Sequence, residues 1–261
     1  MAAENSLERR RSWFPRVSDN SLKIAGAILM TLYFFGAAVI QNGILQVNRY
    51  TPQQLNELLA GDPNAMLWAG IASVAEIIGM TGISIFAYLL AQGAQHTSSM
   101  GKYILSILVF ALISEVPYDL AVYGQVWNWE SQNTLFSVLI ALVCLWMMKY
   151  VEGRGAVSYV LGVVAAAGGC LWSLLLRCKF GWGFVLISAA LFLLRRNRVI
   201  SLIAGLGASL VYLTAAMGFI LVSICTGERR VDESRLTKYG YYVYYPVMLL
   251  LLALVSFLIR R

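Results

Sequence analysis

The chain has 261 residues, of which 59% are hydrophobic and only 13% are charged, and its formal net charge is +7. A soluble domain usually carries about 25% charged residues because its surface faces water. The mean hydropathy of +0.71 therefore excludes a soluble globule and indicates a surface that faces a lipid bilayer. The basic residues stand at the ends of apolar segments rather than on one folded face, so we expect no nucleic-acid partner.

Long apolar runs separated by polar breaks follow a polar and basic N-terminal tail. Each run is near the roughly 20 residues that a helix needs to cross the hydrocarbon core. The predicted spans are 22–47, 65–92, 103–123, 134–150, 156–176, 180–195, 199–224 and 241–259. The fold class is therefore all-α, a polytopic transmembrane bundle of about eight helices. Residues 22–261 form its single domain, and residues 1–21 form a basic cytoplasmic tail.

Two further features complete this topology. Thr51 followed by Pro52 is typical of a capped helix start and predicts a short helix outside the membrane, which ends in a turn at 61–64. Span 180–195 is short, as expected of a re-entrant segment or of a locally thinned bilayer. Lysine and arginine are more frequent on the side of the N-terminal tail, which predicts that both termini are cytoplasmic. The loop 226–239, with four basic residues on the outer side, runs against this bias.

Ionisable residues inside the third span are the first candidates for a functional site, because burying them in a bilayer is costly. Glu115 and Asp119 are four residues apart and therefore share one face of the helix. Pro117 between them lacks a backbone N–H and predicts a kink. We predict Glu115 and Asp119 as catalytic residues. Structural pairing of the same carboxylates is an equally good interpretation.

Other polar residues extend this candidate site. Gln132 and Asn133 begin the next span on the same side of the membrane, and Glu76 lies inside the second span; all three are predicted to bind substrate. For Glu76 a purely structural role is the favoured alternative. His96 ends the second span, where it is either a further catalytic candidate or a helix-end residue favoured by the helix dipole. One histidine and four cysteines without ligand spacing predict no metal site.

Several segments carry a family resemblance. The most specific are Ser-Glu-Val-Pro-Tyr-Asp-Leu at 114–120 and Gln-Asn-Thr-Leu-Phe at 132–136, with Leu-Lys-Ile at 22–24, His-Thr at 96–97 and Tyr-Tyr-Pro at 244–246. Through them the chain resembles the TraX family of bacterial membrane proteins, whose namesake acetylates the N-terminus of a conjugative pilin. The resemblance implies a multi-pass protein of the bacterial plasma membrane with a fold like that of membrane acyltransferases. It implies acetyl-CoA or another acyl-CoA as co-substrate, with no bound cofactor.

The chain departs from the family pattern at polar positions. Tyr33 and Phe34 stand where the family usually has Asp-His, and Met248 stands where it usually has a histidine after Tyr-Pro. Lys179 replaces a family aspartate. Acyl transfer needs a base that removes a proton from the attacking amine or hydroxyl, and neither phenylalanine nor methionine can act as one.

Three functions are therefore open. The favoured one is a catalytically degenerate or altered relative that binds or scaffolds a membrane-protein or peptide partner within the lipid bilayer. The second is an active acyltransferase that moves an acyl group from acyl-CoA to a peptide or other acceptor, with Glu115 or Asp119 as base. The third is a transporter of small solutes or lipids.

Overall fold

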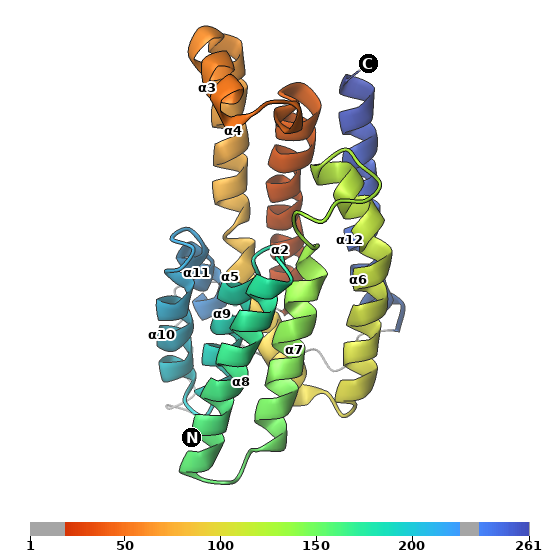
Figure 1. Cartoon of the computed structure of the whole chain (residues 1–261). Helices are drawn as coiled ribbons and strands as arrows, with labels where there is room; N and C mark the ends of the chain where they lie inside the picture. Colours follow the sequence, from red (N-terminus) through yellow and green to blue (C-terminus); the bar gives the residue numbers. More distant parts are fainter. Residues whose placement is uncertain (1–18, 225–234, 261) are drawn as a thin grey trace, which may run out of the picture.

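The computed structural model describes residues 19–224 and 235–260, so most of the predicted tail lies outside the described residues. Within them the regular structure is helical, apart from a single bridge between Gln132 and Cys178. Figure 1 shows a tall bundle of helices that run up and down. The described helices long and apolar enough to cross a membrane cover Asp19–Ile44, Pro63–His96, Met100–Val122, Ala156–Leu175 and Tyr242–Ile259. The predicted all-α membrane bundle is confirmed.

The first span changes its helix type halfway. α2 (Asp19–Phe34) is followed without a break by η1 (Phe35–Ile44), a π-helix. A long π-helical segment is rare and widens the helix. Glycines let η1 approach its neighbours closely: a Cβ on Gly36 would lie 2.9 Å from the Ala72 carbonyl oxygen, and a Cβ on Gly43 would lie 3.1 Å from the hydroxyl of Ser256.

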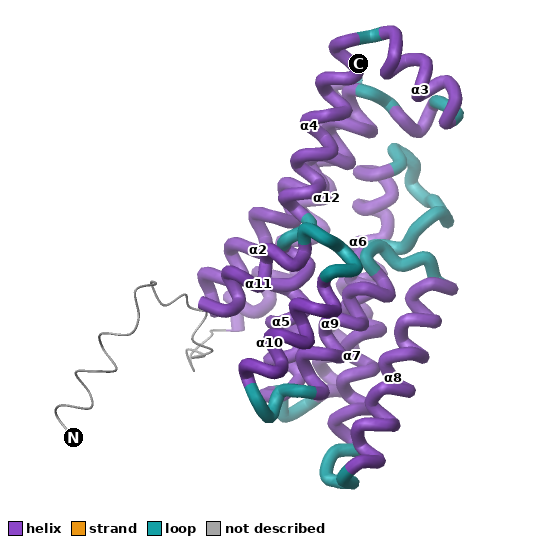
Figure 2. Tube along the Cα trace, turned by 90° about the vertical axis from the view of Figure 1, so that its left-hand side faces the viewer, coloured by secondary structure: helices purple, strands orange, loops and turns teal. Residues whose placement is uncertain are grey.

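The predicted outer helix is present. α3 (Pro52–Gly61) begins with a capping box, in which the Thr51 side chain and Gln54 exchange hydrogen bonds with each other's backbone. α3 and the upper part of α4 (Pro63–Gly79) extend beyond the helices of the lower bundle (Figures 1 and 2). The second span then bends at residues 80–81 and continues as α5 (Gly82–His96).

The middle of the chain follows the prediction closely. α6 (Met100–Val122), α7 (Thr134–Tyr150) and α8 (Ala156–Leu175) each correspond to a predicted span. α9 (Gly181–Leu193) has only 13 residues, or about 20 Å of helix. It lies against α5, α7, α8 and α10, and most of its side chains are buried in the bundle. A short helix is accommodated here because protein rather than lipid surrounds it.

The end of the chain differs from the prediction. The predicted span 199–224 is divided into α10 (Arg198–Ser209) and α11 (Ala215–Ile224). The Ser84 hydroxyl donates to the Ala215 carbonyl at 2.6 Å, which places the start of α11 beside the middle of the second span. One predicted crossing is thus replaced by two short helices.

α12 (Arg235–Ile259) consequently runs parallel to the first span. The Tyr244 hydroxyl donates to the Ala27 carbonyl at 3.2 Å, near the start of both helices, and Arg260 Nε donates to the Asn42 carbonyl at 2.9 Å, near their ends. Figure 1 shows α12 ending at the same end of the bundle as α3. Asp19 and Arg260 therefore lie at opposite ends, which differs from the prediction that both termini are cytoplasmic. Eight full crossings would have made these two spans antiparallel.

Candidate functional site

Glu115 and Asn133 form the centre of the predicted site. Glu115 on α6 is 7% exposed and Asn133 is fully buried. One carboxylate oxygen of Glu115 accepts hydrogen bonds from both the backbone N–H and the side-chain amide of Asn133. The Asn133 amide also donates to the Ala111 carbonyl at 2.8 Å, and its oxygen caps α7 by accepting from the Leu135 N–H at 2.9 Å. The carboxylate and the amide together fix the start of α7 against α6.

Asp119 holds the connection between these helices one turn further along. Its side chain is fully buried, and one oxygen accepts from the Asn128 N–H at 2.8 Å. The hydroxyls of Tyr118 and Tyr123 each lie 2.7 Å from the hydroxyl of Ser131. The loop 123–133 is thus anchored to α6 through polar groups that would otherwise lack partners.

Gln132 contributes to the site through hydrogen bonds of its backbone groups. Its N–H donates to the Arg177 carbonyl at 3.1 Å, and its carbonyl accepts from the Lys179 N–H at 3.0 Å. These bonds join the α6–α7 loop to the α8–α9 loop. Between them lies Cys178, a thiol near Glu115; burial, and then the negative charge of Glu115, raises the pKa of Cys178 to about 12. The thiol is protonated at neutral pH and is not an activated nucleophile.

Glu76 has a cationic neighbour, Lys179, which stands where the family resemblance implies an aspartate. Glu76 is half-buried on α4, with Gln41 in hydrogen-bonding reach and Lys179 as the nearby positive charge. The Lys179 ammonium lies 5.5 Å from the centre of the Tyr33 ring and 5.8 Å from that of Phe180. Lys179 therefore balances charge inside the bundle, while aromatic faces stabilise its ammonium group.

Aromatic rings fill the space between these polar groups. Phe34 is fully buried and makes edge-to-face contacts with Tyr33, Tyr118 and Tyr245, at centroid distances of 5.2, 6.1 and 5.9 Å. Met248 is 5% exposed and belongs to the same core. Both residues replace imidazoles that the family resemblance leads one to expect, and both act as packing residues.

His96 is not brought to this site. It is exposed at the end of α5, where Lys149 donates to the carbonyls of Ala94, Gln95 and Thr97 at 3.0–3.2 Å. α6 starts close to this end, and Glu115 lies 15 residues along it, about 22 Å away. His96 is therefore a helix-end residue on the opposite side of the bundle from the carboxylates.

Some buried oxygens at the centre have no hydrogen-bond partner. Among the described residues these include one carboxylate oxygen each of Glu76, Glu115 and Asp119, and the hydroxyl oxygen of Thr134. Such atoms usually face a water, an ion or a ligand. No group of three or more His, Cys, Asp or Glu side chains within the described parts of the chain is arranged to hold a metal ion.

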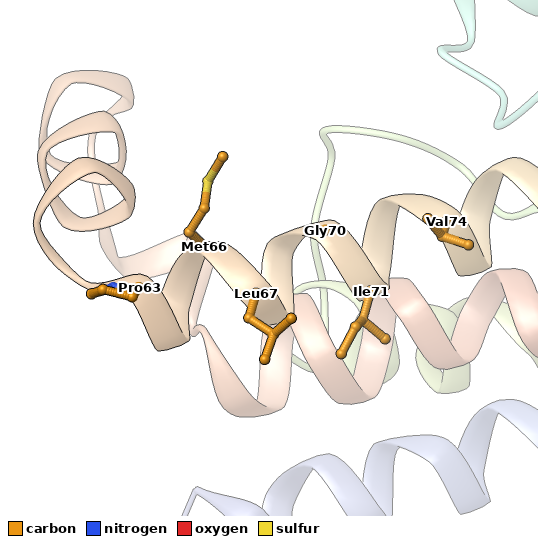
Figure 3. Close-up of a pocket in the computed structure, with 6 residues that line it drawn as sticks. All are labelled: Pro63, Met66, Leu67, Gly70, Ile71 and Val74. Atoms are coloured by element: carbon orange, nitrogen blue, oxygen red, sulfur yellow. The ribbon is translucent and has the colours of Figure 1, made fainter.

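Two hollows of the described surface lie away from these carboxylates. One follows a single apolar face of α4, where Figure 3 shows Met66, Leu67, Ile71 and Val74 along the helix. A second lies where α5, α9 and α10 meet. Neither is lined by Glu115 or Asp119.

Sequence reasoning missed Lys179 and the hydroxyl of Ser131 as members of the centre. Both lie in loops, where neither helical periodicity nor motif spacing identifies a residue as part of a site.

Comparison with known families identifies the family of the chain: the model of the family described as TraX protein matches residues 18–256. The chain belongs to the TraX family. The match begins before α2 and ends within α12, so it joins the separate segments of the resemblance into one continuous stretch over nearly the whole bundle. No curated protein and no solved structure matches the chain.

Proposed function

We propose that this member of the TraX family is a binding or scaffolding protein of the bacterial plasma membrane whose acyl-transfer chemistry has been lost. The observation that carries the proposal is the burial of Phe34 among Tyr33, Tyr118 and Tyr245, at a position where the family resemblance implies a histidine. A ring without a titratable group fills the place of a base.

The remaining groups at the centre are used for folding. A general base must lie within hydrogen-bonding reach of the proton that it removes, and it typically raises a rate by 10²–10⁴. Glu115 instead binds the capping residue of α7, and Asp119 binds the backbone of the loop after α6. His96, the histidine of the chain, lies about 22 Å from Glu115 along α6.

The partner in this proposal is a membrane protein or a membrane-inserted peptide. Most side chains that α8 exposes are large and apolar, among them Val160, Val164, Leu171 and Trp172. In a bilayer such faces contact either lipid or another helix, and helices associate through close packing. A membrane partner can therefore bind to the apolar face of α8 by close packing, without further charged groups.

A specific observation favours active acyl transfer as the second candidate. Glu115 and Asp119 each have a buried oxygen without a hydrogen-bond partner, and a desolvated carboxylate is a stronger base than an exposed one. The transporter alternative stays a prediction, because neither the hollow along α4 nor the hollow between α5, α9 and α10 is lined by the buried carboxylates.

Radiolabelled acetyl-CoA and longer acyl-CoA thioesters test the proposal. The purified full chain in lipid nanodiscs is incubated with each thioester, and coenzyme A release and labelled products are measured. We expect rates equal to those of empty nanodiscs, and a stoichiometric protein partner after purification in mild detergent. Turnover that Glu115→Gln abolishes, and that Glu57→Gln on the exposed face of α3 leaves intact, would establish the second candidate instead.

A further inference from the structure

A hollow of about 140 Å³ opens where α5, α9 and α10 meet. Its polar lining consists of Arg195, Arg198, Gln92, Gln95, Tyr88 and Ser201, and its apolar lining of Ala91, Leu191 and Leu202. It is far from the polar centre around Glu115 and shares none of its residues.

Arg195 is held in a defined position at this hollow. One of its terminal nitrogens donates to the Glu152 carboxylate, and the other donates to the Phe192 carbonyl at 3.0 Å. The guanidinium also stacks over the Phe192 ring, with a centroid distance of 3.9 Å. The Phe192 carbonyl and ring fix the guanidinium without neutralising its charge, so it loses little further freedom when it binds an anion.

The surroundings of the hollow are basic. Lys102, Lys149, Arg154 and Arg196 lie at the same end of the bundle as Arg195 and Arg198. By the positive-inside rule this end faces the cytoplasm, where the anionic lipids of the inner leaflet attract cationic side chains.

We propose that this hollow binds the phosphate headgroup of an anionic phospholipid. Arginine and amide groups are suitable donors to phosphate oxygens. The acyl chains of the lipid would follow the exposed apolar residues of α10, which include Val199, Ile203 and Leu206.

The size of the hollow favours a lipid over a whole soluble ligand. Pockets that enclose an entire drug-sized ligand usually start at about 300 Å³. A headgroup fits because the remainder of the lipid stays in the bilayer.

Competitive lipid binding to the full chain in an uncharged detergent tests this assignment. Bound phosphatidylglycerol and phosphatidylcholine are counted by native mass spectrometry, with inorganic phosphate as a soluble competitor. We expect phosphatidylglycerol to bind at least about fivefold more tightly than phosphatidylcholine. Arg198→Gln should reduce that preference about fivefold, and Gln95→Leu should reduce it in the same direction by a smaller factor. Arg154→Gln, an exposed residue of the same end outside the hollow, should leave the preference unchanged.

The preference is a ratio within one sample, so a loss of folded protein does not imitate it. Equal binding of the two lipids would overturn the proposal. An equal loss in Arg154→Gln and Arg198→Gln would overturn it too, because general surface charge would then explain the effect. Displacement of the lipid by inorganic phosphate at a comparable concentration would show a site for free phosphate rather than for lipid.

Discussion

The polar centre around Glu115 and the basic hollow at the end of α5 use charge in different ways. At the centre, each carboxylate is bound to a group of the fold: Glu115 to Asn133, and Asp119 to the backbone of Asn128. At the hollow, Arg195 is also bound, to Glu152 and to the Phe192 carbonyl, but together with Arg198 it lines an open space at one end of the bundle. Ionisable groups inside a bundle are thus no sufficient sign of catalysis, since a broken helix or a buried loop needs them as partners.

The largest effect is expected where the centre is packed most tightly. Phe34→Ala should destabilise the protein by about 3–5 kcal/mol, because it leaves a cavity among three aromatic rings. Phe35→Ala is the matched control, since Phe35 is the next residue and is 41% exposed. Thermal unfolding of both variants in detergent measures the difference. Equal midpoints would contradict the packed centre.

The second-largest loss of stability is expected from replacing Asn133, whose side-chain amide binds Glu115. Asn133→Ala removes the cap of α7 and takes from the buried Glu115 carboxylate its side-chain donor, leaving only the backbone N–H of residue 133, at a cost of roughly 3 kcal/mol. Asn56→Ala, on the exposed side of α3, should change the free energy of unfolding very little. If Asn133→Ala proved as stable as Asn56→Ala, Glu115 would not be a structural carboxylate.

Asp119 should matter more than His96. Asp119→Ala strands the N–H of Asn128 and costs about 1–3 kcal/mol, whereas His96→Ala changes an exposed helix end. Expression level and thermal midpoint of the two variants provide the comparison. If the protein tolerates both changes equally, the hydrogen bond from Asn128 to Asp119 does not stabilise the loop 123–133.

The smallest effect is expected at the rim of the hollow. Glu152→Gln should alter stability by less than about 1 kcal/mol, because Glu152 is 47% exposed and its ion pair with Arg195 is screened by water. The same change should strengthen binding of phosphatidylglycerol, because it removes a competing anion from Arg195. A weakened lipid preference in this variant, measured by native mass spectrometry, would show that Arg195 does not bind the lipid headgroup in the hollow.

The sequence predicts the fold well where the length of an apolar run is enough to identify a membrane-spanning helix. The spans of α6, α7 and α8 and the capped helix at Pro52 follow from apolar runs and from one threonine cap. The break between α10 and α11 was missed, because residues 210–214 are as apolar as their neighbours and contain no proline or glycine. The direction of α12 depends on that break, so the predicted position of the C-terminus differs as well.

The candidate site was predicted in part. Glu115, Asp119 and Asn133 are brought near one another, because helical spacing and a short connection predict proximity. The contribution of Lys179 was not predictable in this way, since the contact depends on how the α8–α9 loop pairs with Gln132. His96 lies apart because it ends the second span, on the side of the bundle opposite to the carboxylates, and the order of the spans already predicts that position.

The accessibility of Cys178 tests the central claim most directly, because this half-buried thiol lies near Glu115, in the loop between α8 and α9. A variant with Cys178 as the only cysteine is treated in nanodiscs with a water-soluble thiol reagent, with Ser98→Cys in the same background as exposed reference. A thiol reacts as the thiolate, which forms only near and above its pKa, so a pKa of about 12 lowers the rate at pH 8. We predict labelling at least about 100-fold slower than at residue 98, rising as the pH approaches 12. Labelling at pH 8 as fast as at the exposed reference would show that water and small solutes reach Glu115, and would contradict an interior that serves only the fold.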